Sequence, residues 1–220
     1  MLLFPAITQL DLTGPYEVFT KLPRAEVRLV WKSLDPVRAG GGMRMVPDTT
    51  FADCPQLDLI CVPGGAGMNP LLTDAETLDF VRRQAEGARF VTSVCTGALV
   101  LGAAGLLRGR RATTHWMSHA MLSSFGAIPV EERVVVDGNV VTGGGVTAGI
   151  DFGLRIAALV AGEEAAKAIQ LGLEYDPAPP FDAGHPRSAD PRLVERARAA
   201  AAARQAERQA AVDAAAARLG

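Results

Sequence analysis

The residue best suited to nucleophilic chemistry is Cys95, which stands between a strand-like apolar run at 90–94 and a helix-like run after Thr96. The small residues Gly97 and Ala98 leave room for the sharp strand-to-helix turn on which hydrolases present a nucleophile. Such a turn places the thiol at the carboxyl end of a sheet, where open α/β sheets bind ligands, and at a helix N-terminus, which favours the thiolate. We therefore predict a nucleophile at Cys95. The alternative is a buried structural cysteine.

A catalytic thiol needs a proton partner, and Asp11 is the first candidate. We expect a short first strand that ends at Phe4 and a helix that begins near Pro15, a residue suited to the first helical position. Asp11 would then lie in the loop between them, at the same edge of the sheet as Cys95. Helix capping is the alternative role for Asp11. Glu17, inside the helix, is either a second carboxylate or a structural acid.

His115 is a second candidate base, as in Cys–His enzymes. His115 and His119 have the i, i+4 spacing of a metal-binding helix, but the glutamate of the His-Glu-x-x-His pattern is absent, so we predict no metal site. Gly64 and Gly65 follow a strand and bring backbone N–H groups close to a ligand, as in an oxyanion site. The Lys-Ser/Thr pair that a phosphate loop requires is missing.

The elements that must position these residues alternate between strands and helices, which favours a buried parallel sheet. Strands are predicted by short apolar runs at 26–32, 57–62, 90–94, 134–136 and 140–142. The last two runs flank Asp137-Gly138-Asn139 and predict a hairpin. Helices are expected after Pro15, Asp74, Thr96, His115 and Thr147, and over residues 163–173.

The chain has 220 residues, 49% of them hydrophobic, and a formal net charge of −2, so a general attraction to nucleic acid or to an anionic membrane is not expected. Residues 176–191 contain five prolines and predict an extended connector, whereas residues 192–219 are rich in Ala, Arg and Glu and predict a helix. We divide the chain into an α/β domain over 1–185 and a C-terminal helical extension over 186–220. Because acids interleave with the arginines, a helix packed on the body or on a partner subunit is favoured over contact with nucleic acid.

The cysteines and the apolar runs restrict the setting in which the chain works. Cys54, Cys61 and Cys95 are odd in number and unpaired in spacing, which argues against a disulfide framework and a structural zinc site. The first residues lack a basic region followed by a long apolar stretch, and no run approaches the roughly 18 apolar residues of a membrane span. We therefore expect a cytoplasmic protein.

Three motifs together resemble the PfpI-type superfamily, a group related to the glutamine amidotransferases. They are Val-Pro-Gly-Gly at 62–65, Ser-Val-Cys-Thr-Gly at 93–97 and Arg-Ala-Thr-Thr-His-Trp at 111–116. The resemblance implies a three-layer α/β/α sandwich with a flavodoxin-like, mostly parallel sheet, helices on both faces and a nucleophile elbow. Within the superfamily, further stretches over residues 1–185 are similar to the isocyanide hydratases. These stretches are 9–15, 50–55, 143–151 and 173–181.

The resemblance implies an enzyme that adds water to an isocyanide and releases an N-substituted formamide through a covalent cysteine thioimidate. It implies a homodimer without cofactor or metal. It places the nucleophile on Cys95, the catalytic acid on Asp11 and a neighbouring hydroxyl on Thr96. Substrate binding or backbone donation falls to Gly64, Gly65 and Val146. Many relatives carry Glu near the cysteine on a different helix position, so an Asp here argues against their glyoxalase-like chemistry.

Three alternatives stay open at this point. An amidase or protease of the same superfamily would need a His close to the thiol, for which His115 is the candidate. A ligand sensor would append a helix-turn-helix domain, for which the tail is too short and too rich in alanine. An oxidation sensor would use the carboxylate beside the elbow cysteine to stabilise a sulfenic or sulfinic acid.

Overall fold

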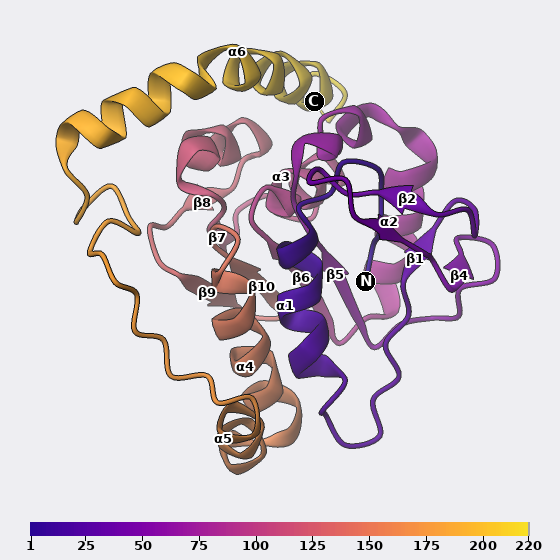
Figure 1. Ribbon diagram of the computed structural model, residues 1–220. Coiled ribbons are helices and arrows are strands. Elements are labelled where there is room, and N and C mark those ends of the chain that lie inside the picture. The colour runs from indigo at the N-terminus through magenta and orange to yellow at the C-terminus, as the bar shows by residue number, and fades with distance from the viewer. Residues whose placement is uncertain (220) are drawn as a thin grey trace.

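The computed structural model describes residues 1–219, which form a parallel sheet covered by helices (Figure 1). The central strands lie in the order β5 (Leu59–Val62), β6 (Phe90–Val94), β10 (Val140–Gly143) and β9 (Val134–Asp137). The first three run parallel, and β9 returns antiparallel to β10, which confirms the predicted hairpin. Every residue of β6 and β10 is buried, as expected for a strand with neighbours on both sides and helices on both faces.

The sheet continues beyond β5 through the first residues of the chain. Leu2 bridges in parallel to Val30 of β1 (Val30–Trp31), and its N–H donates to the carbonyl of Cys61 at 2.9 Å. β1 in turn pairs in parallel with β4 (Thr49–Thr50). With residues 1–4 as the first strand and the two-residue edge strand β4 left aside, the parallel strands lie in the flavodoxin-like order 2-1-3-4-5. The order reverses between residues 1–4 and β5, so a ligand site is expected beside the ends of these two strands.

Helices cover both faces of the sheet and complete the three-layer sandwich (Figure 1). On one face lie α1 (Gln9–Phe19), α4 (Ala148–Ala161) and α5 (Glu163–Gly172). On the other lie α2 (Ala75–Gly87) and α3 (Gly97–Ala103). Shorter 3₁₀ turns are η1 (Ala66–Met68), η2 (Pro70–Thr73) and η3 (Trp116–Phe125). Two small ladders lie outside the main sheet: β2 (Val37–Arg38) with β3 (Arg44–Met45), and β7 (Arg111–Ala112) with β8 (Ile128–Pro129).

Three sequence-based expectations were wrong in detail. α1 begins at Gln9 instead of near Pro15, so Pro15 lies inside the helix and Asp11 belongs to its first turn. Residues 26–29 are not strand, because only Val30 and Trp31 of that run pair with β4. The segment after His115 forms the 3₁₀ turns of η3 instead of an α-helix. At about three residues per turn, His115 and His119 no longer share a helix face.

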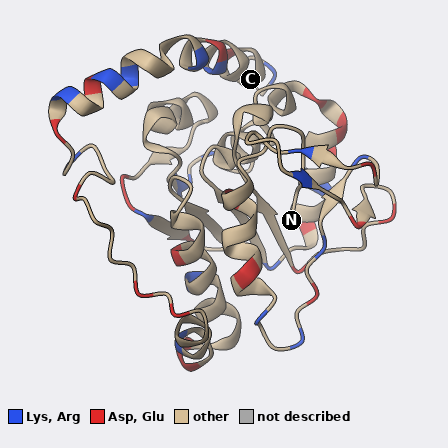
Figure 2. Cartoon of the chain, viewed as in Figure 1, with Lys and Arg blue, Asp and Glu red and all other residues tan. Residues whose placement is uncertain are grey.

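The last helix, α6 (Pro191–Ala216), confirms the helix predicted near the C-terminus. Pro191 occupies its first turn, and the Asp190 side chain accepts the N–H of Arg192 at 2.7 Å as an N-cap. α6 arches over η3, η2 and α3, while residues 173–190 run back along the molecule from α5 (Figure 1). Basic residues are interleaved with a few acidic residues along α6 (Figure 2). Among the described residues, no helix combines the length and the apolar character that crossing a membrane requires.

Candidate active site

Cys95 occupies the corner between β6 and α3, as the sequence predicts. It is 5% exposed and has a φ of 55°, in the left-handed region that costs an L-residue about 1–2 kcal/mol. Hydrogen bonds hold this conformation, because the Cys95 N–H donates to the carbonyls of Gly143 and Gly144 at 3.0 and 2.9 Å. The Cys95 carbonyl accepts the hydroxyl of Thr114 at 2.7 Å. The thiol is therefore presented from a fixed corner at the carboxyl end of the sheet.

Asp11 reaches the same place from the first turn of α1. Its side chain is fully buried, and Oδ2 accepts the N–H of Gly64 at 3.0 Å. The carboxyl also lies close enough to the Cys95 thiol for the two side chains to interact. Oδ1 is buried without a hydrogen-bond partner among the described residues, which leaves one acceptor of the carboxyl available for a proton. The structure thus brings together two groups that are 84 residues apart, as the edge-of-sheet argument predicts.

The glycine loop after β5 holds the side chains of this site. Gly64 donates its N–H to Asp11, and Gly65 donates its N–H to the Thr96 hydroxyl oxygen at 3.0 Å. Both N–H groups are bonded within the protein in this structure, and an oxyanion site formed by them stays a prediction. Gly65 has a φ of 138°, and a Cβ on Gly64 would lie 2.5 Å from the Thr96 nitrogen. Only glycines allow the loop to approach Asp11 and Thr96 this closely.

Burial controls the pKa values of the two reactive groups. Burial raises the pKa of Asp11 to about 7, against smaller lowering effects from Cys95 and from the Gly64 N–H. Burial, and then the charge of Asp11, raises the pKa of the Cys95 thiol, although the N–H groups of Thr96 and Val146 oppose the shift. The sequence-based expectation of a lowered thiol pKa was therefore wrong. The fully protonated pair holds two protons, and it loses the first near neutral pH. Because two negative charges in a buried site repel each other, the carboxyl and the thiol then share the remaining proton.

A family model for the DJ-1/PfpI family matches residues 1–159 of the chain. The chain belongs to this family. An isonitrile hydratase from Pseudomonas putida is 61% identical over 201 residues, covering 91% of this chain and 88% of that protein. A crystal structure of a THiJ/PfpI family protein from Pseudomonas syringae matches with a TM-score of 0.94 and 43% identity, over 96% of this chain and 88% of that one. The predicted family and α/β sandwich are confirmed.

A transcriptional regulator of the helix-turn-helix type, GbdR from Pseudomonas aeruginosa, shares 33% identity with 64% of this DJ-1/PfpI chain. The chain covers only 38% of that regulator. The similarity to a regulator therefore concerns a part of it alone, whereas the similarity to the isonitrile hydratase extends over nearly the whole of both proteins.

His115 does not pair with the nucleophile of this DJ-1/PfpI protein. Its Nδ1 accepts the N–H of Met117 at 3.3 Å, and its ring stacks on Trp116 at 5.9 Å. No hydrogen bond joins His115 to Cys95 among the described residues. Burial, and then the positive charges of Arg208 and Arg204, lowers the pKa of His115 to about 4. The imidazole is therefore neutral at pH 7 and lacks the contact that a Cys–His pair needs.

Glu17 lies outside the site. Its side chain is exposed and forms an ion pair with Lys21 at 3.0 Å, one turn further along α1. Of the two interpretations left open by the sequence, this contact favours the structural acid. Asp11 is the carboxylate of α1 that faces the nucleophile.

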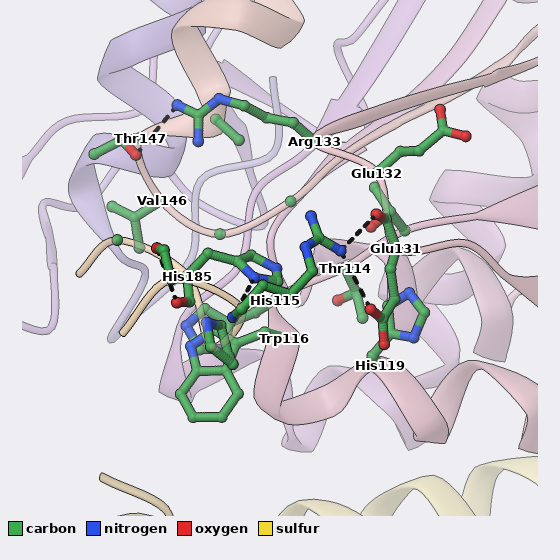
Figure 3. Close-up of a pocket in the computed structure, with 18 of the residues that line it drawn as sticks. Thr114, His115, Trp116, His119, Glu131, Glu132, Arg133, Val146, Thr147 and His185 are labelled. Carbon is green, nitrogen blue, oxygen red and sulfur yellow. Dashed lines mark hydrogen bonds and ion pairs between the residues drawn. The ribbon is translucent and has the colours of Figure 1, made fainter. Parts of the chain in front are cut away.

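Figure 3 shows a cavity of about 710 Å³ whose lining includes Thr114, His115 and Val146. Thr114 and Val146 line it, and each also contacts Cys95, so they mark the end of the cavity nearest the sulfur. Gly144 and Gly145 also line it, so the segment before α4 borders this cavity. The remaining wall comes from η3, the turn before β9 and the connector after α5. Its side chains include those of His115, Trp116, Glu131, Arg133, Phe181 and His185.

Ion pairs at the outer end of this cavity tie the connector to the body. Arg133 Nε donates to Asp151 Oδ2 at 2.6 Å, and the Tyr175 hydroxyl donates to the same oxygen at 3.0 Å. Further along the connector, Arg187 pairs with Glu131 at 3.3 Å. These contacts fix both ends of the segment that borders the cavity.

Sequence reasoning missed two residues close to the elbow. Thr114 belongs to the Arg-Ala-Thr-Thr-His-Trp motif, yet nothing local indicates that its hydroxyl holds the carbonyl of Cys95. Arg208 of α6 is buried and bonds to Asn69 and Ser118, which flank the elbow. The sequence does not distinguish Arg208 from the other arginines of this alanine-rich helix, so its burial could not be predicted.

Proposed function

We propose that this DJ-1/PfpI protein is an isocyanide hydratase, which converts an isocyanide and water into an N-substituted formamide. The observation that carries the proposal is the 61% identity, over 91% of the chain, with the isonitrile hydratase of Pseudomonas putida. In the proposal Cys95 is the nucleophile, Asp11 is the acid and base, and Thr96 positions them. The contact between a buried thiol and a buried carboxyl supports these roles.

The first step forms a covalent thioimidate. The terminal carbon of an isocyanide accepts both a nucleophile and a proton. The Cys95 sulfur forms a bond to this carbon while the proton shared by the pair passes through Asp11 to the same carbon. The product is R–N=CH–S–Cys95, and Asp11 is left as a carboxylate. A carboxyl with a pKa near 7 exchanges protons readily in both directions near neutral pH, which suits this role.

The second step uses the same carboxylate as a base. Asp11 takes a proton from water, whose oxygen adds to the thioimidate carbon, and then passes that proton to the nitrogen. Collapse of the tetrahedral intermediate breaks the C–S bond and returns the hydroxyl proton to Asp11. The formamide R–NH–CHO leaves, and the pair again holds one proton. The N–H groups of Thr96 and Val146, which lower the pKa of the thiol, stabilise the sulfur as it departs.

The surroundings of the pair support a substrate with an apolar substituent. Trp116, Val146 and Phe181 line the adjacent cavity, and Val146 lies at the end next to Cys95. An alkyl or aryl group would pack against these side chains while the isocyanide carbon points to the sulfur. The roles of Gly64 and Gly65 in this proposal are to hold Asp11 and Thr96.

The test is formamide formation from a small aryl or alkyl isocyanide, with wild type beside Cys95→Ala. We expect turnover by the wild type and none above background by Cys95→Ala. Cys54→Ala is the matched control, since Cys54 is only partly buried and lies far along the chain from the elbow. Mass spectrometry of the quenched reaction should detect the thioimidate adduct on the peptide that contains Cys95.

Two outcomes would contradict the proposal. Turnover retained in Cys95→Ala would exclude covalent catalysis by this thiol. A wild type that leaves every isocyanide unchanged while its thiol reacts with peroxide would favour the oxidation sensor. A cysteine amidase is disfavoured by the absence of a His115–Cys95 contact among the described residues, and amide hydrolysis that His115→Ala abolishes would restore that alternative.

The proposal includes a homodimer in the cytoplasm, working without a cofactor. Leu171 near the end of α5 is 83% exposed, and Val160 near the end of α4 is also exposed, which is the kind of apolar surface that self-association would cover. All three cysteines are free thiols, which suits a reducing compartment. Light scattering of the purified protein and fractionation of expressing cells test these two points.

A further inference from the structure

Arg208 is a buried cation without an anionic partner in the structure. It lies on the inner side of α6 and is 5% exposed. No ion pair joins it to a carboxylate anywhere in residues 1–219. Burying an unpaired charge is costly, so a guanidinium in this position needs a compensating anion.

The hydrogen bonds of Arg208 tie α6 to Asn69, which caps η2, and to Ser118 in η3, and both of these segments contact α3, the helix of the elbow. Nη1 donates to the hydroxyl of Ser118 at 2.9 Å, and Nε donates to the side-chain oxygen of Asn69 at 3.2 Å. Asn69 follows the glycine loop that holds Asp11 and Thr96. Ser118 follows His115, whose carbonyl accepts the Ser118 N–H at 2.8 Å. Both partners are neutral, so they orient the guanidinium without cancelling its charge.

We propose that Arg208 is a positioning residue whose charge stabilises the thiolate of Cys95. It would do so before the sulfur attacks the substrate and again when the sulfur leaves the covalent intermediate. The counter-anion of this buried cation is then the sulfur itself, whenever the thiol has lost its proton. This inference builds on the proposed function, but the effect on the thiol does not require an isocyanide. It assigns α6 a part in the chemistry as well as in the packing.

The charges around the sulfur are consistent with this assignment. Burial lowers the pKa of Arg208, and the charge of Cys95 opposes that shift; burial and then the charge of Arg208 lower the pKa of His115. The guanidinium therefore lies within electrostatic reach of both side chains. The other titratable groups that interact with Cys95 or Arg208 are Asp11 from α1, His115 from the start of η3 and Arg204 from α6. Asp11 carries negative charge and opposes thiolate formation, and His115 is neutral at pH 7. Arg204 is exposed, so solvent screens its charge.

The experiment measures the pH dependence of Cys95 alkylation by iodoacetamide, followed by mass spectrometry of the peptide that contains Cys95. Arg208→Gln should raise the apparent pKa of alkylation by about one unit, which corresponds to about tenfold slower alkylation at pH 7. Arg208→Lys, which keeps the charge, should recover most of the shift. The matched control is Arg204→Gln, one turn earlier on the same helix and exposed, and its profile should coincide with that of the wild type.

An Arg208→Gln profile that coincides with the wild type overturns the proposal. So does an Arg208→Lys profile shifted as far as that of Arg208→Gln, because hydrogen bonding instead of charge would then explain the effect. If Arg208→Gln fails to fold, Gln205→Glu places a carboxylate three residues before Arg208, at a side chain whose Oε1 is buried without a partner. Gln205→Glu should neutralise the guanidinium and raise the apparent pKa in the same direction, and an unchanged profile would again contradict the proposal. Because alkylation needs no isocyanide, failure here is distinct from failure of the proposed reaction.

Discussion

The elbow site, called the inner end below, and the far wall of the adjacent cavity, called the outer end, are built from different kinds of contact. At the inner end, the side chains of Asp11 and Thr96 are fixed by backbone N–H groups from the glycine loop, and both are buried. At the outer end, Arg133 and Asp151 form an ion pair between partly exposed side chains. One region is held by main chain and the other by long side chains.

This difference indicates which properties each end controls. The N–H groups of Gly64 and Gly65 cannot move away without deforming the edge of the sheet, and their buried hydrogen bonds are little affected by salt. The inner end therefore fixes the positions of the reacting atoms. Exposed ion pairs contribute about 0–1 kcal/mol and weaken in salt, so the outer end tunes access. The effect of a substitution should therefore fall from the inner end to the outer end, and the following predictions test that gradient.

Asp11→Asn should give the largest effect on turnover after loss of the nucleophile. The amide oxygen can still accept the Gly64 N–H, so the fold is retained, but the side chain can no longer move a proton. We expect kcat for formamide formation to fall by about 10²- to 10⁴-fold. A variant that folds normally by circular dichroism and keeps kcat within a few-fold of the wild type would remove Asp11 from the chemistry.

Gly64→Ala should disturb the inner end without removing any reactive group. The new Cβ would lie 2.6 Å from the Thr96 hydroxyl and 2.9 Å from Asp11 Oδ2, so these side chains must shift. We expect a loss of about 1–3 kcal/mol in the free energy of unfolding and a fall of up to about 10²-fold in kcat. Gly41→Ala is the control, since its Cβ would meet nothing within 4 Å. Equal effects of the two substitutions would mean that the loop does not position the pair.

The buried carboxyl should also make stability depend on pH. The pKa of Asp11 is about 7 in the folded protein against an ordinary value of 3.8, so the folded state binds the proton more tightly. Stability should then be greatest below pH 4 as far as this group is concerned, and should decrease as the pH rises through 7. Asp11→Asn lacks this group, so its melting temperature should rise relative to that of the wild type between pH 4 and pH 8. A difference that is constant across this range would contradict the raised pKa.

Tyr175→Phe should have the smallest effect, because it removes only the hydrogen bond to Asp151 at the outer end. We expect KM to change by no more than about fivefold and kcat to stay level, in keeping with a contact worth at most about 1 kcal/mol. Added salt should change the KM of the wild type and of the variant alike, because the Arg133–Asp151 ion pair is present in both. A large fall in kcat would show that the outer end also positions the reacting atoms, and the proposed gradient would then be wrong.

The sequence predicted best what local chemistry determines. The β-branched run at 90–94 and the small residues after Cys95 specify the elbow within about ten neighbouring positions, and the structure confirms it. The position of Asp11 in a helix could not be read this way. Pro15 is typical of a helix start, but α1 begins earlier because it packs on α4, where Gly149 lets the two helices approach closely enough to contact Pro15.

Other features depend on contacts between distant segments. The raised pKa of Cys95 follows from burial beneath several elements, which outweighs the helix N-terminus that the local pattern reveals. The hydrogen bond from Arg208 to Asn69 joins residues that are 139 positions apart in the sequence. The composition of residues 192–219 therefore predicted a helix, but it could not show which of its side chains pack against the body. The division of the chain at residue 185 stays a prediction, since α6 packs closely on the α/β body.

The left-handed conformation of Cys95 has an evolutionary consequence. Glycine adopts this conformation without a steric penalty, so Cys95→Gly should relieve strain while removing the sulfur. Selection for stability alone would favour glycine at this corner. A glycine at position 95 would make the protein more stable but would remove the nucleophile. A cysteine that is kept at this position despite its strain would therefore indicate that the organism depends on the reaction.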